Sequence, residues 1–368
     1  QTGLPETLPR PHQPLLESPM RVRETIRRMQ PYTPPLEGRD PKQMLLLDFN
    51  ESLIPPPPPV REAIIRFLDE NRMQTYPDYG DFEPRLARYL GVNPDEVLIT
   101  NGSDQGIEVV FRAFLEKEDP VLFPEPTFSM YRQIAQTLDA RVVTVAYGPA
   151  MEFPAQQLEA AITPATRLLM LASPNNPTGK AVPAPWLEGL LERHPRLAVV
   201  VDEAYHEFCG ETFIPLLRRH ANLAVIRTFS KAFALAGLRL GVVVGRAEFM
   251  AELKKIRGPY DMNMLAVVAA RAQLDHPQAM TAYIREVMDV AKPKVEAFLT
   301  RHGVRFYPSD ANFLLISLEN AGEAAAWLQS QNILVRPQKS APGTFRLTIG
   351  PLVAMERFME AFARFLSR

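Results

Sequence analysis

The chain has 368 residues, 46% hydrophobic and 23% charged, a composition typical of a soluble globular protein, and this length predicts about two domains of ~150 residues. Its formal net charge of −1 argues against nucleic acid or an anionic membrane as a partner. The single cysteine, Cys209, excludes an intrachain disulfide and CxxC motifs, and we predict no metal site. No apolar run reaches the ~20 residues of a membrane span. We therefore predict a cytoplasmic protein.

The N-terminal part is rich in proline, of which the chain has 36. We predict that roughly the first twenty residues form a poorly ordered extension, because polar, proline-rich segments bury little apolar surface. A short helix is predicted over 21–32, ending at Pro31. Five consecutive prolines at 55–59 predict a stiff connector before a helix over 60–71, since proline suits the first helical turn. A docking segment for a proline-binding partner is the alternative.

From residue 95 onward, short apolar runs alternate with helical patterns. The runs are continuous, which is typical of strands covered by helices on both faces of a sheet. This rhythm predicts an open, doubly wound α/β fold. The predicted strands lie at 97–100, 121–123, 141–147, 167–172, 197–202, 223–229 and 238–245, with helices over 103–116, 127–138, 156–162 and 185–194.

The pattern changes after about residue 260 and predicts a second, smaller α/β domain. A long helical stretch over roughly 264–301 precedes strands at 313–318, 333–337 and 345–350 and a final helix over 352–366. We therefore divide the chain into an extension at 1–30, a segment at 31–59 that packs on the small domain and the site, a large domain at 60–262 and a small domain at 263–368.

Polar residues follow five of the predicted strands. In open α/β sheets, ligands bind at the carboxyl ends of the strands, so these five segments are expected to form one site. They are NGSDQG at 101–106, PEPTF at 124–128, SPNNPTG at 173–179, DEAY at 202–205 and SK at 230–231.

Three of these segments indicate particular chemistry. Lys231 lies among small and apolar residues with no acid beside it, which favours the neutral, nucleophilic form of its amine; a lysine that extends to solvent from a buried segment would look the same. The small residues at 101–106 open a helix whose free N–H groups suit a phosphate, or form a simple N-cap. Asp202 ends a buried strand, where an unpaired carboxylate is costly, so it either meets a cation or caps the next turn.

Several neighbours can act on the same ligand. Ser230 and Arg239 offer a hydroxyl and a guanidinium to an anion, while Tyr205, Asn176 and Phe128 offer a phenol, an amide and a flat ring. An anion site, a pyridinium partner, a phenolate partner, a stacking ring and an amine together describe pyridoxal 5′-phosphate, with Lys231 on its aldehyde. Asn176 in a plain turn and Phe128 in a core are the structural alternatives.

The motifs SPNNPTG, VDEAYHEF and RTFSKAFALAGLRLG, in this order, resemble the fold-type I pyridoxal-phosphate aminotransferases. Within them the chain is similar to the histidinol-phosphate aminotransferases of the class II subgroup, from about Tyr32 to the C-terminus. The resemblance implies a large domain with a mostly parallel seven-stranded sheet covered by helices, and a smaller C-terminal α/β domain.

The resemblance also implies roles for individual residues. Lys231 would form the Schiff base and move the proton, Asp202 would pair with the pyridine nitrogen, and Tyr205 would bond the 3′ oxygen. The implied cofactor ligands are Ser103, Asp104, Phe128, Asn176, Asp202, Tyr205, Ser230, Lys231 and Arg239, with Tyr76 supplied across a homodimer interface. The implied substrate ligands are Tyr32, Asn50, Tyr76, Asn176, Arg336 and Arg346. Two departures stand out, since Phe128 replaces a frequent tyrosine and DFNES at 48–52 replaces an N-A-N-E-type run.

The implied activity is a transamination that interconverts histidinol phosphate and imidazole acetol phosphate with 2-oxoglutarate and glutamate, in histidine biosynthesis. Transamination of aromatic amino acids and a threonine-phosphate-decarboxylase-like lyase remain open alternatives. An effector-binding module fused to a DNA-binding domain is disfavoured, because the leading extension is short and proline-rich and the net charge is near zero.

Overall fold

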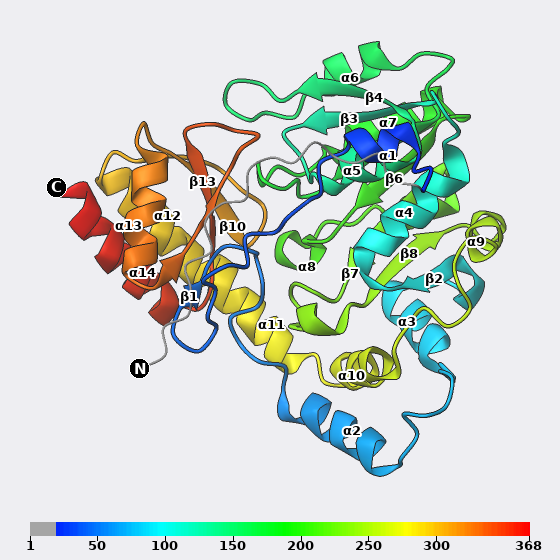
Figure 1. Ribbon diagram of the computed structural model, residues 1–368, viewed down its shortest axis with the longest axis horizontal. Coiled ribbons are helices and arrows are strands. Elements are labelled where there is room, and N and C mark those ends of the chain that lie inside the picture. The colour runs from blue at the N-terminus through cyan, green and yellow to red at the C-terminus, as the bar shows by residue number, and fades with distance from the viewer. Residues whose placement is uncertain (1–19) are drawn as a thin grey trace.

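The computed structural model describes residues 20–368, so the first nineteen residues of the predicted extension lie outside the described part. Two units lie side by side, and each is built around a sheet (Figure 1). The strands of the larger sheet lie between residues 97 and 245, and those of the smaller sheet lie between residues 305 and 348. The segment that precedes α2 runs along both units, so it reaches the space where they meet (Figure 1).

The larger sheet has seven strands within the described residues, in the order β2-β8-β7-β6-β5-β3-β4. Six strands run in one direction and only β8 runs antiparallel to its neighbours. The prediction of a mostly parallel sheet of seven strands is therefore confirmed. The strands are β2 (Val97–Thr100), β3 (Pro120–Glu125), β4 (Arg141–Ala146), β5 (Leu168–Ala172), β6 (Ala198–Asp202), β7 (Leu223–Thr228) and β8 (Gly241–Gly245).

Helices cover both faces of this sheet, which is why its strands are continuously apolar. In β5, Leu169 and Leu171 pack in the core on one face, while Leu168 and Met170 pack in the core on the other. Each such buried side chain contributes about 1.5–3 kcal/mol relative to exposure. One face is covered by α4 (Gly102–Phe114), α5 (Met130–Thr137) and α9 (Ala247–Lys254), and the other by α2 (Pro58–Asp69), α3 (Phe82–Leu90), α7 (Ala184–Arg193) and α10 (Met264–Asp275).

The smaller unit has a four-stranded sheet in the order β12-β13-β10-β9, with helices against it. Its strands are β9 (Arg305–Tyr307), β10 (Phe313–Ser317), β12 (Arg336–Pro337) and β13 (Thr344–Thr348). Its helices are α11 (Gln278–Arg285), the π-helical segment η4 (Glu286–Ala291), α12 (Lys292–Arg301), α13 (Ala321–Ser330) and α14 (Leu352–Leu366).

The N-terminal segment joins the two units. Helix α1 (Glu24–Arg28) packs against α5. Further along, β1 (Leu45–Leu46) pairs in parallel with β11 (Ile333–Leu334) of the smaller unit. Residues 48–50 follow directly and lie where the two units meet. The remaining short elements are α6 (Ala155–Ala161), α8 (His206–Cys209) and the 3-10 turns η1 (Pro94–Glu96), η2 (Ile214–Arg218) and η3 (Ala236–Leu238).

The structure corrects several predicted elements. The helical stretch over 264–301 breaks at His276 and Pro277, because proline lacks the N–H that would continue α10. The strand predicted at 333–337 divides into β11 and β12, which join different sheets. The connection after β6, predicted as a loop, contains α8 and η2, and α3, α9, β1 and β9 were not predicted. Helix α2 begins at Pro58, two residues before the predicted start at 60, because proline is compatible with the first helical turn.

Candidate active site

The carboxyl ends of six parallel strands lie along one edge of the large sheet, and the predicted site residues gather there. Because β8 runs in the opposite direction, Arg239, which precedes it, comes to the same edge. The residues that follow β2, β5, β6 and β7 at this edge include Ser103, Asp104, Asn175, Asn176, Tyr205, Ser230 and Lys231, and Asp202 is the last residue of β6.

A cradle for an anion forms at the first turn of α4. Arg239 donates from Nη1 to Ser230 Oγ at 3.2 Å and from Nη2 to Asp104 Oδ2 at 3.0 Å. Glycine is required on both sides of this cradle. A Cβ on Gly102 would lie 2.6 Å from Arg239 Nη2, and a Cβ on Gly241 would lie 2.4 Å from the Gly102 carbonyl carbon. The free N–H groups of a helix N-terminus, with an arginine and a hydroxyl beside them, suit a phosphate.

Asp202 is a carboxylate held inside the protein. It is 5% exposed, and it accepts hydrogen bonds from Tyr131 Oη at 2.9 Å and from the Ala204 N–H at 3.1 Å. Burial raises the pKa of Asp202 to about 6, although the hydrogen bond from Tyr131 opposes this rise. A cation placed against this carboxylate would repay its lost hydration. The site is therefore suited to a ligand with a protonated ring nitrogen.

Tyr131 is a functional residue that our reading of the sequence missed. It is fully buried in α5, where its ring meets the ring of Phe128 edge-on at 5.7 Å between centroids, and the ring of Phe123 at 6.0 Å. Its hydroxyl reaches Asp202, 71 residues away in sequence. No local pattern indicated this role, because the bond joins α5 to the end of β6, two elements far apart in the sequence.

Tyr131→Phe should lower kcat/KM about tenfold to hundredfold, since a hydrogen bond to a charged group contributes about 1.5–3 kcal/mol. Loss of this bond also raises the pKa of Asp202 further, so the acidic limb of the pH–rate profile should move to higher pH. Steady-state kinetics over a pH series measure both effects. The phenylalanine ring keeps the packing against Phe123 and Phe128, so an unchanged profile would contradict the role of the hydroxyl.

Lys231 brings a primary amine to the space between the units. Its Nζ donates to the carbonyl of Phe49 at 2.7 Å and lies 5.8 Å from the centre of the Tyr205 ring. The lysine itself is half-buried, and Phe229 and Phe233 on either side of it are buried, as the apolar sequence predicts. An amine from the large sheet thus meets an oxygen of the N-terminal segment.

Asn50 connects the N-terminal segment to both units. It is fully buried, and its backbone adopts the left-handed conformation with φ 55°, which asparagine tolerates better than most residues. Its Nδ2 donates to Tyr205 Oη at 3.0 Å, and Thr348 Oγ1 donates to its Oδ1 at 2.9 Å. The Tyr205 ring also packs edge-on against Phe313 of the small sheet, at 5.0 Å. Thr348 was not predicted, because no local pattern places it at the site.

Two arginines of the small sheet face the site together. Arg336 and Arg346 are directly opposite each other in the β12–β13 ladder, so their side chains lie on the same face. Arg346 is buried, and it donates to Asn176 Oδ1 and to the Asp48 carbonyl. Burial lowers the pKa of Arg346, and the charge of Arg336 adds to this effect. Its Nε has no hydrogen-bond partner within residues 20–368. An anion would relieve this pair of like charges.

Other predicted residues have looser positions. Arg336 lies with its guanidinium carbon 5.4 Å from the centre of the Phe49 ring, and it makes a long contact of 3.5 Å with Tyr32 Oη. Tyr76 is 78% exposed and stacks on Tyr260 at 4.6 Å between ring centroids. In the described part of the chain, no hydrogen bond joins Tyr76 to the residues of the sheet edge, so the structure does not bring it into the site.

Asn175, which was not predicted as a site residue, holds the loop that contains Asn176. Asn175 is fully buried and donates from Nδ2 to the Pro126 carbonyl at 3.0 Å and to Thr178 Oγ1 at 2.9 Å. It accepts from Thr127 Oγ1 at 2.6 Å. These bonds tie the loop after β5 to the loop after β3. They position Asn176 toward Arg346.

A buried group of charges lies behind Asp202 in the VDEAYHEF segment. Arg227 contacts Glu203 at 2.7 Å and Glu207 at 3.6 Å, and it donates to Thr212 Oγ1 at 2.8 Å. One arginine thus serves two buried carboxyl groups. Burial raises the pKa of Glu207 to about 7, and the charge of Arg227 opposes this rise. Glu207 Oε2 lacks a hydrogen-bond partner among the described residues.

Glu207→Gln should remove one source of alkaline destabilisation. The pKa of Glu207 rises from 4.5 to about 7 on folding, so its contribution to stability is complete below pH 4.5 and is lost as pH rises through 7. The loss amounts to about 3 kcal/mol at pH 8. Urea unfolding at pH 5 and pH 8 should show that the variant loses less stability than the wild type over this interval. The exposed Glu211→Gln is the control, and equal losses in all three proteins would contradict the prediction.

Comparisons with known proteins agree with this geometry. The sequence matches the family Aminotransferase class I and II over residues 42–362. It is 37% identical to the histidinol-phosphate aminotransferase of Symbiobacterium thermophilum over 356 residues, covering 92% of this chain and 97% of the relative. It is 36% identical to the enzyme of the same name from Limosilactobacillus fermentum over 318 residues, covering 84% and 88% of the two chains.

The fold also matches a solved structure. The histidinol-phosphate aminotransferase of Sinorhizobium meliloti, in complex with pyridoxal 5′-phosphate, superposes with a TM-score of 0.85 at 24% identity, covering 95% of this chain and 99% of the other. At this identity the likeness establishes the fold. No helix in residues 20–368 combines the length and apolar character needed to cross a membrane.

Proposed function

This chain belongs to the class I and II aminotransferase family, and we propose that it transfers an amino group between glutamate and imidazole acetol phosphate, forming histidinol phosphate in histidine biosynthesis. The observation that carries the proposal is the sheet edge itself, where the Lys231 amine, the buried Asp202 carboxylate and the Arg239 cradle occur together. The choice of substrate is based on the two relatives, both named histidinol-phosphate aminotransferase.

The residues at this edge fit pyridoxal 5′-phosphate. Its phosphate would lie in the cradle of Ser230, Arg239 and the N–H groups at Ser103 and Asp104, which glycines at 102 and 241 keep open. Asp202 would hold the ring nitrogen in its protonated form, while Tyr205 and Asn176 would bond the 3′ oxygen and Phe128 would stack on the ring. When bound, the cofactor withdraws electrons from the Cα of an attached amino substrate.

Lys231 would serve this chemistry in two ways. Its Nζ would hold the cofactor aldehyde before the substrate arrives, and afterwards it would remove the proton from the substrate Cα. An amine must be neutral to accept this proton. Asp202 and Tyr205 would keep the ring oriented, because Tyr131 and Asn50 hold their side chains in place.

Arg336 and Arg346 would bind the anionic groups of the substrates. Arg346 would serve the carboxylate of glutamate and the phosphate of the oxo substrate in turn, since a guanidinium fork matches both. Its unpartnered Nε, within the described residues, leaves a donor for such an anion. Tyr32 and Asn50 would close over the substrate from the N-terminal segment.

The test is a half-reaction titration of the purified, cofactor-loaded protein. Histidinol phosphate should discharge the absorbance of the lysine-bound cofactor at least about a hundredfold more efficiently than phenylalanine or tyrosine. Equal or better reaction with the aromatic amino acids would identify an aromatic aminotransferase. Release of carbon dioxide from threonine phosphate, without formation of pyridoxamine phosphate from glutamate, would identify a lyase.

Arg336→Ala should separate the two kinds of substrate. Loss of a guanidinium from a phosphate site should lower kcat/KM for histidinol phosphate about a hundredfold, and leave that for phenylalanine within about threefold. Steady-state kinetics with both donors measure this difference. A uniform loss with both would assign Arg336 a structural role instead.

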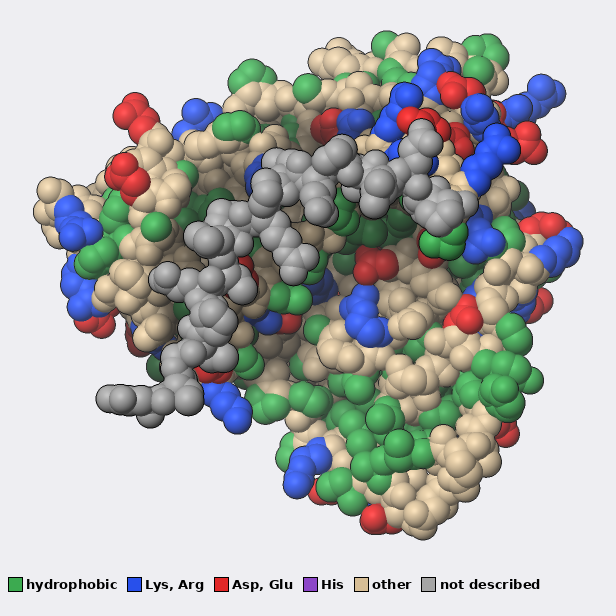
Figure 2. Space-filling model, viewed as in Figure 1, with side chains coloured by type: hydrophobic (Ala, Val, Ile, Leu, Met, Phe, Trp, Pro, Cys, Tyr) green, Lys and Arg blue, Asp and Glu red, His purple; other side chains and the backbone are tan. Residues whose placement is uncertain are grey.

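We also propose that two copies of the chain form the active unit, with Tyr76 reaching the cofactor phosphate of its neighbour. Figure 2 shows hydrophobic side chains gathered over the region of α2 and α10. The exposed hydrophobic residues of this region include Ile65, Leu68, Met73, Tyr76 and Tyr260. A surface of this kind suits a subunit contact. We further propose a cytoplasmic location. We also propose domain boundaries after residues 30, 59 and 262.

A further inference from the structure

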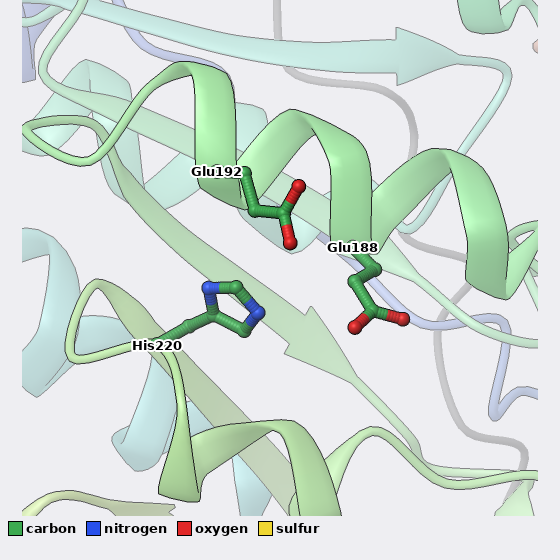
Figure 3. Close-up of side chains that lie close together, drawn as sticks. All are labelled: Glu188, Glu192 and His220. Atoms are coloured by element: carbon green, nitrogen blue, oxygen red, sulfur yellow. The ribbon is translucent and has the colours of Figure 1, made fainter.

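A second group of polar side chains lies away from the active site, toward the amino ends of β6 and β7. Glu188 and Glu192 stand four residues apart on α7, and His220 lies in the loop between η2 and β7 (Figure 3). One ligand atom from each residue lies within 4.8 Å of the others. The sequence did not indicate this group, because His220 is far from the two glutamates along the chain and belongs to a separate element.

His220 shows that the group is more than an acidic patch. The histidine is only 9% exposed, and its Nε2 has no hydrogen-bond partner in the part of the chain that the structure describes. Figure 3 shows the ring with its outer nitrogen directed toward the two carboxylates. A buried, unpaired ring nitrogen is costly, and a metal ion is a partner that could offset this cost.

The loop that carries His220 is firmly held beside α7. Asn222 donates from Nδ2 to the carbonyls of His194 and Leu197, both at 3.1 Å, in the connection that follows α7. The His220 N–H also bonds to the Leu216 carbonyl at 2.9 Å. The imidazole is therefore positioned by the backbone, while the two glutamates have longer and more exposed side chains that can adjust.

We propose that Glu188, Glu192 and His220 bind a divalent transition-metal ion of the zinc class. One imidazole nitrogen with two carboxylate oxygens suits Zn²⁺, Co²⁺ or Ni²⁺, whereas Mg²⁺ and Ca²⁺ take oxygen ligands. Zinc bonds these atoms at about 2.0–2.2 Å in tetrahedral geometry, so two of its ligand atoms lie about 3.4 Å apart. The three ligand atoms lie within 4.8 Å of one another, so the glutamate side chains must move toward His220 when the ion binds.

The position of the site indicates a structural role. His220 precedes β7 by three residues, and Glu192 lies at the end of α7 that leads into β6. Both therefore lie toward the amino ends of these strands, whereas Lys231 and Asp202 lie at the carboxyl ends. A bound ion would link α7 to the loop before β7 without touching the amine or the carboxylate of the active site.

Arg219 competes with the metal. Its Nη1 forms an ion pair with Glu188 Oε1, and the arginine side chain is 59% exposed. This pair must open before Glu188 can bind a cation. An exposed ion pair contributes only about 0–1 kcal/mol, so the competition is weak.

Isothermal titration of the tag-free, cofactor-loaded protein with zinc chloride tests the site. The wild type should bind one equivalent, Glu192→Gln should weaken this binding at least about tenfold, and Arg219→Gln should strengthen it about two- to fivefold. Zinc at a hundred times its Kd should also raise the wild-type Tm by several degrees more than that of Glu192→Gln. The control is His276→Ala, which removes an exposed histidine and should leave the affinity unchanged.

Glu192→Gln keeps the shape of an exposed side chain, so its folding is not in question, and His220→Ala should abolish the same binding event. Equal zinc affinity in the wild type and in Glu192→Gln would overturn the proposal, and so would a wild type that binds no equivalent up to about 1 mM zinc. Neither result bears on transamination, because the readout is binding and not turnover.

Discussion

Replacing Lys231 with alanine is expected to lower kcat about 10³- to 10⁴-fold, while the protein still binds pyridoxal 5′-phosphate. The loss is large because Lys231 supplies the primary amine that would move the substrate proton. The cradle of Arg239 and the carboxylate of Asp202 remain in the variant, so the cofactor is retained without its covalent link. Steady-state kinetics and the absorbance of the bound cofactor measure both effects.

Borohydride treatment of the wild type supplies the matching chemical test. It should fix the cofactor permanently to the peptide that contains residue 231, and peptide mapping by mass spectrometry locates the label. Lys292 is the useful comparison, since it is a buried lysine of the small unit whose Nζ donates to the Ser309 carbonyl. A label on the Lys292 peptide, or a colourless protein that takes up no cofactor, would refute the proposed function.

Asp202→Asn is expected to lower kcat/KM about 10²- to 10³-fold, as removal of a preorganised charge from a buried site does in other enzymes. The neutral amide cannot hold a protonated ring nitrogen. In the wild type, one carboxylate oxygen accepts from the Tyr131 hydroxyl and the other accepts from the Ala204 N–H. The asparagine has only one oxygen, so its NH₂ group must face one of these two donors. Kinetics and the dissociation constant of the cofactor report the two losses.

The same variant tests the titration of the carboxyl group. In the cofactor-free protein the pKa of Asp202 is raised from 3.8 to about 6, so its contribution to stability is complete below pH 3.8 and is lost as pH rises through 6. The cofactor would place its protonated ring nitrogen beside the ionised carboxylate. The affinity for the cofactor should therefore increase between pH 5 and pH 7 more in the wild type than in Asp202→Asn. The same pH dependence in both proteins would show that Asp202 does not pair with the ring.

Local patterns in the chain were sufficient for most of the large unit. Strands such as Leu168–Ala172 and Leu223–Thr228 are short and largely apolar, and a strand buries every residue of such a run when helices cover both faces of its sheet. The final helix, Leu352–Leu366, was also predicted over the residues where it occurs. Other elements were missed, including α3 and α9, and proline interrupted a helical stretch that looked continuous.

The candidate residues that follow strands could be predicted for a related reason. Parallel strands end at one edge, so Asp202, Ser230 and Lys231 must come near one another once the sheet forms. Arg239 needed more information, since it reaches that edge only because β8 runs antiparallel. Tyr131 and Thr348 could not be found from their own surroundings, because each acts through hydrogen bonds to one residue that is distant in sequence.

Order along the chain thus determined the type of sheet, the family motifs and the side chains that reach its carboxyl edge, since these depend on short-range periodicity and strand direction. Contacts between elements decided everything that depends on packing in three dimensions. They placed Asn50 between Tyr205 and Thr348, set Arg336 opposite Arg346, and brought His220 to the glutamates of α7. Such partners meet only when the hydrophobic core fixes the helices and sheets relative to one another, and a local pattern carries no record of that arrangement.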